Sequence, residues 1–237
     1  MSDITVVILC GGKGTRIRHA SVDVPKLLIM VGGRPILWHV MKIYASQGFN
    51  NFILCLGYEG KKIEEYFENN NDEDWNIQFV NTGLESAKSE RIQQIKSLIK
   101  GDDFFLAYGD DVADIDLTAL LNFHRSKGVI MTITAVRMLS PFGILEKDGN
   151  TDLIIKFKEK PKLDKWMNGG FMVSTKAIFN YLALGELESQ VFEELVRLKQ
   201  ICAYNHEGEW RSMNTLKDVI ELNNLWENKN AFWKIWK

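Results

Sequence analysis

The sequence is poor in cysteine and has no long apolar run. Its three cysteines, Cys10, Cys55 and Cys202, stand far apart and form no Cys-X-X-Cys pair or cysteine–histidine cluster. This spacing excludes a disulfide framework and a structural zinc site, and it is typical of a reduced compartment. No segment approaches the roughly 20 apolar residues of a membrane span, and the apolar start at 4–10 is too short for a signal-peptide core. We therefore expect a cytoplasmic protein with no membrane partner.

An excess of charge of one sign is also missing. The chain has 29 lysines and arginines against 31 aspartates and glutamates, which gives a formal net charge of −2. A balanced chain offers no global attraction to nucleic acid, so no nucleic-acid partner is expected and any anion must be bound locally. No repeat, low-complexity tract or Pro/Gly-rich linker marks a boundary, and 237 residues suit one core. We expect a single domain over 1–237.

Short apolar runs alternate with helical patterns in the first half of the chain. The run at 4–10 predicts a strand buried on both faces, and 36–47 predicts a helix that ends at Gly48. The same patterns predict strands at 52–56, 77–80 and 104–108 and helices at 61–69 and 91–100. Alternation of this kind predicts right-handed crossovers, and hence an α/β fold with a mixed, mainly parallel sheet flanked by helices.

The second half has strand patterns with little helix between them. Strands are predicted at 129–137, 142–146, 153–159, 169–173 and 201–204, and we expect them to form an antiparallel or mixed extension of the sheet. Helices are predicted from Thr175, around 191–199 and near 216–226. Trp226, Trp233 and Trp236 lie on a terminal amphipathic segment, where such aromatics indicate packing or a dimer contact.

The stretch "VVILCGGKGTRIR", 6–18, places three glycines and two arginines behind the first predicted strand. Glycines let backbone N–H groups approach phosphate oxygens, and Arg16 adds a charged fork, although a tight turn is the alternative. A dinucleotide fingerprint needs a third glycine where Ile17 stands, and the Walker pattern lacks its Gly-Lys-Ser/Thr. The pattern thus indicates a phosphate loop of another kind, with Gly11, Gly12, Gly14, Thr15 and Arg16 as the candidate cradle.

The stretch "FFLAYGDDVAD", 104–114, ends a predicted buried strand with Asp110 and Asp111. Open α/β sheets bind ligands at the carboxyl ends of their strands. Carboxylates there suit Mg²⁺, which takes oxygen ligands and bridges a protein carboxylate to substrate phosphates. A simple turn is the alternative interpretation of the two aspartates. Lys26, in "PKLL", would by itself be an ordinary surface lysine.

Taken together, these motifs resemble the sugar-1-phosphate nucleotidyltransferases, in particular the glucose-1-phosphate cytidylyltransferases. The likeness spans nearly the whole chain. It rests on "GGKGTRI" at 11–17, "PKLL" at 25–28, "GGRPILWHVMKIYASQG" at 32–48, "YGDDVADIDLTALLNFHRSKG" at 108–128, "FG" at 142–143, "FKEKP" at 157–161, "NGGFMV" at 168–173 and the tryptophan-rich end from Trp210. The resemblance implies a nucleotide-diphospho-sugar transferase fold, the substrates CTP and a sugar 1-phosphate, a Mg²⁺ cofactor, and a role in nucleotide-sugar and cell-surface polysaccharide synthesis.

The resemblance also implies roles for individual residues. The glycine loop and Arg16 would hold the β- and γ-phosphates, Lys26 the α-phosphate, Asp110 the Mg²⁺, Glu159 the sugar hydroxyls and Lys160 the sugar phosphate. The implied catalytic set is Arg16, Lys26, Asp110 and Lys160. The implied nucleotide-binding set is Cys10, Gly11, Gly12, Gly14, Thr15, Arg16, Lys26, Thr82, Arg91, Asp110 and Asp111, and the sugar-binding set is Gly143, Glu159, Lys160, Asn168 and Gly169.

This assignment makes physical sense, because joining two phosphate-bearing molecules requires cancelling the repulsion between their negative charges. The sugar phosphate oxygen is already ionised, so the reaction needs alignment and no protein nucleophile. Histidine bases are therefore not required. His39 and His124 fall inside predicted helices, and we expect both to be structural.

Two segments depart from the family pattern. In "WRSMNT", 210–215, Asn214 stands where relatives carry the aspartate that is the second metal ligand. An amide oxygen can bind Mg²⁺ but adds no charge, so metal affinity should fall unless Asp111 compensates. The predicted metal set is therefore Asp110, Asp111 and Asn214. A nucleotide-binding regulatory protein whose catalysis has lapsed is the alternative that this substitution motivates.

The second departure is in "TGLESAKSERIQQIK", 82–96. Lys88, Ser89 and Glu90 replace small residues that approach the base in relatives, and we expect them to crowd or redirect it. Another NTP or another phosphorylated acceptor is therefore an open alternative. The segment 69–78 is shorter than the one implicated in subunit contacts of relatives, so the hexamer of relatives is not expected and a homo-oligomer is left open.

Overall fold

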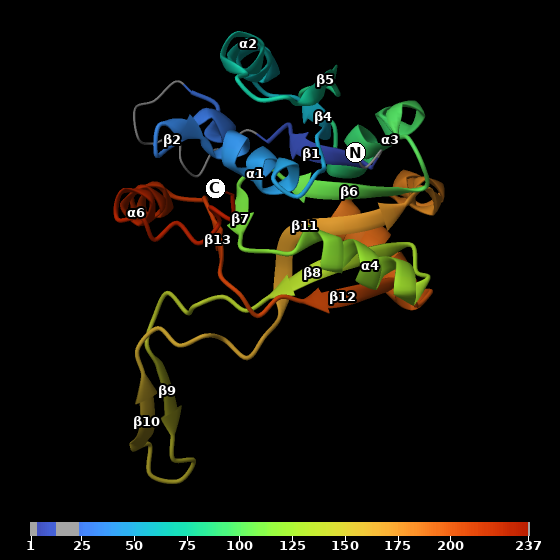
Figure 1. Cartoon of the computed structure of the whole chain (residues 1–237). Coiled ribbons are helices and arrows are strands. Elements are labelled where there is room, and N and C mark those ends of the chain that lie inside the picture. The colour runs from blue at the N-terminus through green and yellow to red at the C-terminus, as the bar shows by residue number, and fades with distance from the viewer. Residues whose placement is uncertain (1–3, 13–23, 237) are drawn as a thin grey trace.

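The structure is a computed structural model that describes residues 4–12 and 24–236. Its centre is a seven-stranded sheet with the strand order β12-β8-β11-β6-β1-β4-β5 (Figure 1). Only β11 runs antiparallel to its neighbours in this sheet; the other pairs are parallel. The predicted mixed, mainly parallel α/β fold is confirmed. The strands are β1 (Thr5–Cys10), β4 (Asn51–Leu56), β5 (Asn76–Asn81), β6 (Asp103–Tyr108), β8 (Met131–Val136), β11 (Met167–Thr175) and β12 (Ile201–Asn205).

Strand β1 shows why these apolar runs become central strands. It lies between β4 and β6, and its side chains alternate between two hydrophobic clusters, with Val6 and Ile8 in one and Val7 in the other. A strand covered on both faces needs apolar residues at every position, which is the pattern the sequence has. β1 ends at Cys10, so the chain enters Gly11 and Gly12 at the carboxyl edge of the sheet.

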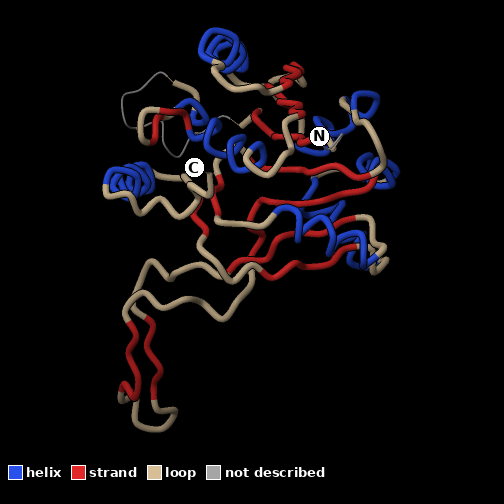
Figure 2. Tube along the Cα trace, viewed as in Figure 1, coloured by secondary structure: helices blue, strands red, loops and turns tan. Residues whose placement is uncertain are grey.

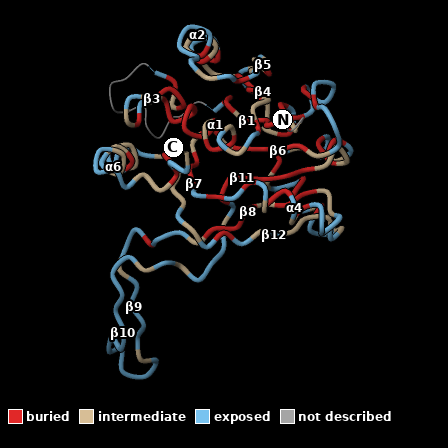
Figure 3. Tube along the Cα trace, in the orientation of Figure 1, coloured by how far each residue is buried: buried red, intermediate tan, exposed pale blue. Residues whose placement is uncertain are grey.

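Helices cover both faces of the sheet (Figures 1 and 2). The buried side chains of α1 (Ile36–Ala45), α2 (Gly60–Asn70), α4 (Leu117–Lys127) and α6 (Leu216–Glu227) join the cluster that contains Val6. Those of α3 (Lys88–Gln94) and α5 (Phe192–Arg197) join the cluster that contains Val7. The buried strands thus form the middle of three layers (Figure 3).

Two helix predictions differ from the structure. The helix expected from Thr175 is wrong, because the chain there forms two 3₁₀ turns, Lys176–Asn180 and Leu182–Leu184. The second turn ends at Gly185, whose φ of 127° is a conformation open mainly to glycine and incompatible with a continuing helix. The helix predicted at 91–100 starts earlier, as α3, and finishes in a 3₁₀ turn at Lys96–Leu98.

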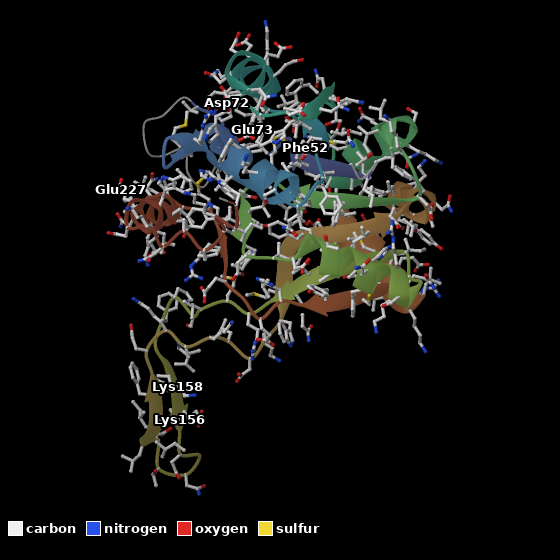
Figure 4. The ribbon with its side chains drawn as sticks, in the orientation of Figure 1. Phe52, Asp72, Glu73, Lys156, Lys158 and Glu227 are labelled. Atoms are coloured by element: carbon white, nitrogen blue, oxygen red, sulfur yellow. The ribbon has the colours of Figure 1, made fainter. Side chains whose placement is uncertain are left out.

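The predicted sheet extension at 142–159 is also wrong. β9 (Ile144–Lys147) and β10 (Ile154–Lys158) form a separate antiparallel hairpin that projects from the body of the protein (Figures 1 and 3). Its side chains, Lys156 and Lys158 among them, lie away from the core (Figure 4). The reason is topological: the hairpin connects β8 to β11, and these strands pair with each other, so the connection leaves from the end of the sheet.

Smaller elements bring the end of the chain to the sheet. β7 (Asp111–Ala113) pairs with β13 (Trp210–Ser212), and β2 (Met30–Val31) pairs with β3 (Arg34–Pro35). Helix α6 begins with a capping box in which the Thr215 hydroxyl and the Asp218 carboxylate bond each other's backbone N–H groups. Among the helices of the described residues, none combines the length and apolar character that crossing a membrane requires.

His39, a residue of α1, lies in a cluster of aromatic side chains. The rings of Trp38, Trp226 and Trp233 stand 5.2, 4.9 and 6.0 Å from its imidazole. The Trp233 indole N–H donates to Nδ1 of His39 at 3.3 Å, so Nε2 carries the proton and donates to the Val31 carbonyl at 2.7 Å. Burial lowers the pKa of His39 to about 4. The imidazole is neutral and fully bonded, which confirms the expected structural role.

His124 is also structural. It is buried, and its Nδ1 lies 2.8 Å from the Thr132 hydroxyl oxygen. Burial lowers the pKa of His124 as well, which favours the neutral ring.

Candidate active site

A cavity of about 1050 Å³ lies at the carboxyl ends of β1 and β6. Its volume is at the upper end of the range of small-molecule sites, which suits two substrates side by side. Many of the residues predicted from the sequence lie in its walls, although they come from distant parts of the chain. Those residues are Gly11, Gly12, Lys26, Arg91, Asp110, Asp111, Lys160, Asn168 and Asn214.

The most closely knit group in the cavity is formed by Lys26, Asp110 and Asn214. The Lys26 ammonium is ion-paired with Oδ2 of Asp110 and donates to Oδ1 of Asn214 at 3.0 Å. The side chains of Lys26 and Asp110 keep 15% and 19% of their surface exposed. The ammonium therefore sits between two oxygen donors that face a cavity, where a ligand can still reach all three groups.

Local folding fixes each member of this group. Lys26 opens the 3₁₀ turn Lys26–Leu28 after Pro25, and Asp110 follows β6. Gly109, between β6 and Asp110, packs closely against the Leu27 side chain, since a Cβ there would lie 2.8 Å from the Leu27 Cδ1. This close approach brings the lysine turn against the end of β6.

Asn214 reaches the group through the pairing of β13 with β7. The Met213 N–H donates to the Asp110 carbonyl at 2.9 Å, just beyond the paired strands. The amide nitrogen of Asn214 donates to the Ser212 hydroxyl at 2.7 Å, which turns Oδ1 toward Lys26. The Asp218 carboxylate accepts from the Asn214 backbone N–H at 2.9 Å and so ties the residue to the start of α6.

Asp111 lies beside the group but is buried. Burial raises the pKa of its carboxyl well above the usual range, and the neighbouring Asp110 charge adds to this, while a hydrogen bond with Ser212 opposes it. Gly170 leaves room for the carboxyl, because a Cβ at Gly170 would lie 2.0 Å from Oδ2 of Asp111. Burial therefore disfavours the charged form of Asp111.

The oxygen donors here fit a magnesium ion that is held mainly by its substrate. Within residues 4–12 and 24–236, no cluster of three or more histidine, cysteine, aspartate or glutamate side chains could form a metal site. The Asp110 carboxylate and the Asn214 amide oxygen converge on one point, which the Lys26 ammonium now fills. Mg²⁺ commonly takes one or two protein oxygens and completes its shell with water and phosphate. The donor set suits that mode of binding.

Arg91, on α3, is bonded to the backbone of the glycine loop. Its guanidinium is buried and donates to the Thr82 hydroxyl at 2.7 Å and to backbone carbonyls, including that of Gly11 at 3.5 Å. Gly11 is required for this approach, since a Cβ there would lie 2.2 Å from the guanidinium carbon. Thr82 and Cys10 are buried behind the wall and do not line the cavity. Thr82 and Cys10 are therefore part of the packing behind the cavity wall and do not face a ligand.

Of the five residues predicted to bind the sugar, two line the cavity and three do not. Lys160, with a φ of 43°, and Asn168 line the cavity. Gly143 and Glu159 lie against each other at the root of the projecting hairpin and are outside the cavity wall, as is Gly169, whose carbonyl accepts from the Trp210 indole at 2.8 Å. The remaining predicted residues, Gly14, Thr15 and Arg16, lie outside the described residues.

Only Lys88 of the three residues expected to crowd the base lines the cavity. Ser89 is buried, and the Glu90 carboxylate caps α3 by accepting from the Ala87 N–H at 2.8 Å. Lys88 is ion-paired with Glu188, whose carboxylate also accepts from the Tyr108 hydroxyl at 2.6 Å. Sequence reasoning missed Tyr108 and Glu188. Tyr108 could have been found from its place directly before Gly109 and Asp110, whereas Glu188 lies in no motif.

Two glycines, a lysine and a carboxylate line one cavity at the carboxyl edge of a mainly parallel sheet, which is where α/β proteins of the open-sheet class bind their ligands. Residues 5–230 match the profile of the nucleotidyl transferase family, and the chain belongs to that family.

Individual relatives agree with this assignment. The chain is 39% identical to a probable glucose-1-phosphate cytidylyltransferase of Bacillus subtilis, over 97% of this chain and 99% of that protein. It is 36% identical to the glucose-1-phosphate cytidylyltransferase of Salmonella typhimurium, over 98% and 99%. The crystal structure of HddC from Yersinia pseudotuberculosis superposes with a TM-score of 0.74 at 21% identity, covering 94% of this chain and 99% of that one. The predicted family is confirmed by sequence, and the predicted fold by structure.

Proposed function

We propose that this protein transfers CMP from CTP to a sugar 1-phosphate, giving a CDP-sugar and pyrophosphate. The relatives named as cytidylyltransferases, aligned over nearly the full chain, support this choice of substrates. The observation that carries the proposal is the Lys26–Asp110–Asn214 group, which shares with Gly11 and Gly12 a cavity large enough for both substrates.

The chemistry requires charge cancellation and alignment. An oxygen of the sugar phosphate attacks the α-phosphorus of CTP, and the bond from that phosphorus to the β-phosphate oxygen breaks, so pyrophosphate leaves with the electron pair. No proton has to move, because the attacking oxygen is already ionised. The rate therefore depends on holding several anionic groups in line and close together.

Residues of this chain would supply that environment. The backbone N–H groups of Gly11 and Gly12 would meet the nucleotide phosphates, and Arg91, which is bonded to the Gly11 carbonyl, would hold the turn that carries them. Lys26 would neutralise the charge that grows at the α-phosphate, and Lys160 would hold the sugar phosphate. Arg16 is proposed for the β- and γ-phosphates, together with Gly14 and Thr15.

Asp110 and Asn214 would hold a magnesium ion that offsets the charge of the triphosphate when the nucleotide is bound. Lys26 would then exchange its contacts with these two side chains for the α-phosphate. Asp111 is proposed as a third oxygen ligand, although burial disfavours the charged form that binds a metal ion. Asn168 lines the same cavity as Lys160 and would contact the sugar, and Glu159 and Gly143, at the root of the hairpin, are proposed as further contacts.

A pyrophosphate-release assay tests the proposal. The purified protein is incubated with Mg²⁺, each of the four NTPs and a panel of sugar 1-phosphates, and release is measured with and without the acceptor. We expect the highest rate with CTP and glucose 1-phosphate, and none without acceptor. Tight CTP binding with no release for any acceptor would favour a regulatory nucleotide-binding protein, the alternative that Asn214 motivates.

A further inference from the structure

A hydrogen-bonded chain of four side chains ends at Asn168, the residue proposed to contact the sugar. Lys88 opens α3, and its ammonium is ion-paired with Oε1 of Glu188. The Tyr108 hydroxyl donates to the same Oε1 at 2.6 Å. The amide nitrogen of Asn168 in turn donates to the Tyr108 hydroxyl oxygen at 3.5 Å. The chain thus links Asn168, on β11, to the end of β6 and to α3.

The direction of donation is fixed at each link of this chain. Burial raises the pKa of Tyr108, so its hydroxyl keeps the proton that it donates to Glu188. Burial alone would raise the pKa of Glu188, but hydrogen bonds from Lys88 and Tyr108 outweigh it and lower that pKa, so the carboxylate is an ionised acceptor. Because its one proton is donated to Glu188, the Tyr108 oxygen can only accept from Asn168.

The carbonyl oxygen of the Asn168 amide is also bonded. It accepts from the Gly170 N–H at 2.9 Å, within a bulge of β11 where the register against β8 shifts between Asn168 and Met172. Gly170 has a φ of 78°, and a Cβ there would lie 3.1 Å from Cδ2 of Tyr108, so the bulge packs against the tyrosine ring. With its oxygen bonded and one N–H donated to Tyr108, the amide has its second N–H left for a ligand in the cavity that Asn168 lines.

The surroundings of this amide belong to the sugar side of the site. Tyr108 and Asn168 line the cavity together with Lys160, which is proposed for the sugar phosphate and lies in the connection that leads into β11. Glu188 keeps 40% of its side-chain surface exposed and is not part of the lining. A ligand in the cavity can therefore contact Asn168 directly, whereas Glu188 acts on Asn168 through Tyr108.

We propose that Tyr108 and Glu188 are positioning residues that turn the Asn168 amide so that its second N–H donates to one hydroxyl oxygen of the sugar. The inference rests on the proposed function, in which Asn168 contacts the sugar, and it gives a role to two residues that have none there. A donor held in one direction favours a hydroxyl at the matching ring position. A sugar that lacks this hydroxyl binds more weakly, because it leaves the amide N–H unpaired.

The test measures the binding of CDP-glucose and of its four monodeoxy analogues, which lack the hydroxyl at C2, C3, C4 or C6 of the glucose, by calorimetry. Each analogue has a penalty, namely the ratio of its dissociation constant to that of CDP-glucose. Asn168→Ala identifies the hydroxyl that the amide contacts. It should abolish the penalty at one ring position, about five- to tenfold in the wild type, and leave the other penalties unchanged.

Tyr108→Phe should reduce the penalty at that same position to about twofold, because phenylalanine keeps the ring against the bulge but cannot accept from the amide. The double variant Tyr108→Phe/Asn168→Ala should have the penalties of Asn168→Ala alone, since the tyrosine acts through the amide. Glu188→Ala should reduce the penalty too. Glu188→Gln should retain most of it, because the glutamine oxygen still accepts from the Tyr108 hydroxyl. The dissociation constant of CTP should stay within about twofold of the wild type in all of these variants.

Tyr181→Phe is the matched control, because it removes the hydroxyl of a tyrosine outside the cavity wall, and it should leave every penalty unchanged. Two outcomes overturn the inference: a folded Tyr108→Phe protein that keeps the full penalty at the Asn168 position, and one that binds CTP and all the analogues equally more weakly. Failure of the proposed function has a different appearance, namely a wild-type protein that releases no pyrophosphate from any substrate pair. The CDP-glucose constants decide the role of Tyr108 in that case too, and absence of CDP-glucose binding by the wild type would also overturn it.

Discussion

The polar groups of the cavity and those of the aromatic cluster around His39 differ in how far they are exposed and bonded. In the cavity, Lys26 and Asp110 are paired yet partly exposed, so both can exchange partners when a ligand enters. In the cluster, both nitrogens of His39 are bonded and the ring is buried among tryptophans. A polar group that keeps an accessible face is available for chemistry, whereas one that is enclosed and fully bonded contributes to folding. The following experiments test that contrast.

The largest effect should come from Lys26→Met. The variant removes the positive charge from the proposed α-phosphate site, and we expect kcat/KM to fall by about 10³-fold or more. Because the Lys26–Asp110 pair is partly exposed, the midpoint of thermal unfolding should move by no more than about 4 °C. Steady-state kinetics and calorimetry check the two parts. A large loss of stability with little loss of rate would reverse the contrast.

Trp233→Ala should show the opposite pattern. The Trp233 side chain is fully buried and bonded to His39, so its removal leaves a large cavity. We expect the free energy of unfolding to drop by about 3 kcal/mol or more, while kcat/KM of the folded protein stays near that of the wild type. Urea unfolding measures the first quantity. If stability changes by less than about 1 kcal/mol, the cluster is not the folding element described here.

The stability of the cluster should depend on pH. The pKa of His39 is about 4 in the folded protein and 6.5 when unperturbed. Between these values the unfolded chain binds a proton that the folded protein does not, so stability is complete above pH 6.5 and is lost as the pH falls toward 4. The loss should approach about 3 kcal/mol.

Urea unfolding at several pH values measures this dependence. His39→Gln, which does not titrate, should remove the part of the slope that His39 contributes. An equal slope in the variant and the wild type would show that other groups cause the pH dependence.

The smallest effect is expected for Asn214→Asp. A second carboxylate beside Asp110 should tighten divalent-metal binding by about three- to tenfold, offset by competition from Lys26 for the same oxygens. Manganese binding, followed by electron paramagnetic resonance, measures this apart from activity. Asn230→Asp, at an exposed position beyond the end of α6 and outside the cavity wall, adds the same charge elsewhere and should change nothing. An unchanged metal affinity in Asn214→Asp would place residue 214 outside the metal shell.

Much of the fold could be predicted from the sequence, because buried parallel strands such as β1 need apolar residues at every position. The hairpin β9–β10 could not be placed in this way. Its strands are rich in isoleucine, leucine and phenylalanine, as sheet strands are, and only the pairing of β8 with β11 shows that they leave the sheet. The 3₁₀ turns after Thr175 were missed because short apolar stretches favour 3₁₀ turns and α-helix alike.

The site was predictable where a motif marks a strand end. Asp110 was identified from its place after a predicted strand, and Lys26 and Asn214 were identified from the resemblance to the family; the structure brings the three together. Arg91 was identified too, but its buried contacts with backbone carbonyls required coordinates. Glu188 could not be predicted, because it lies in a segment without a motif and pairs with Lys88, which is 100 residues away in the sequence. Long-range pairs of this kind follow from packing and leave no local trace.

The most direct test of the account is pyrophosphate release from CTP and glucose 1-phosphate in the presence of Mg²⁺, measured side by side for the wild-type protein and Lys26→Met. We predict acceptor-dependent release by the wild type and a rate about 10³-fold lower for the variant at equal folded concentration. Equal rates for the two proteins, or release that does not depend on the sugar phosphate, would contradict it.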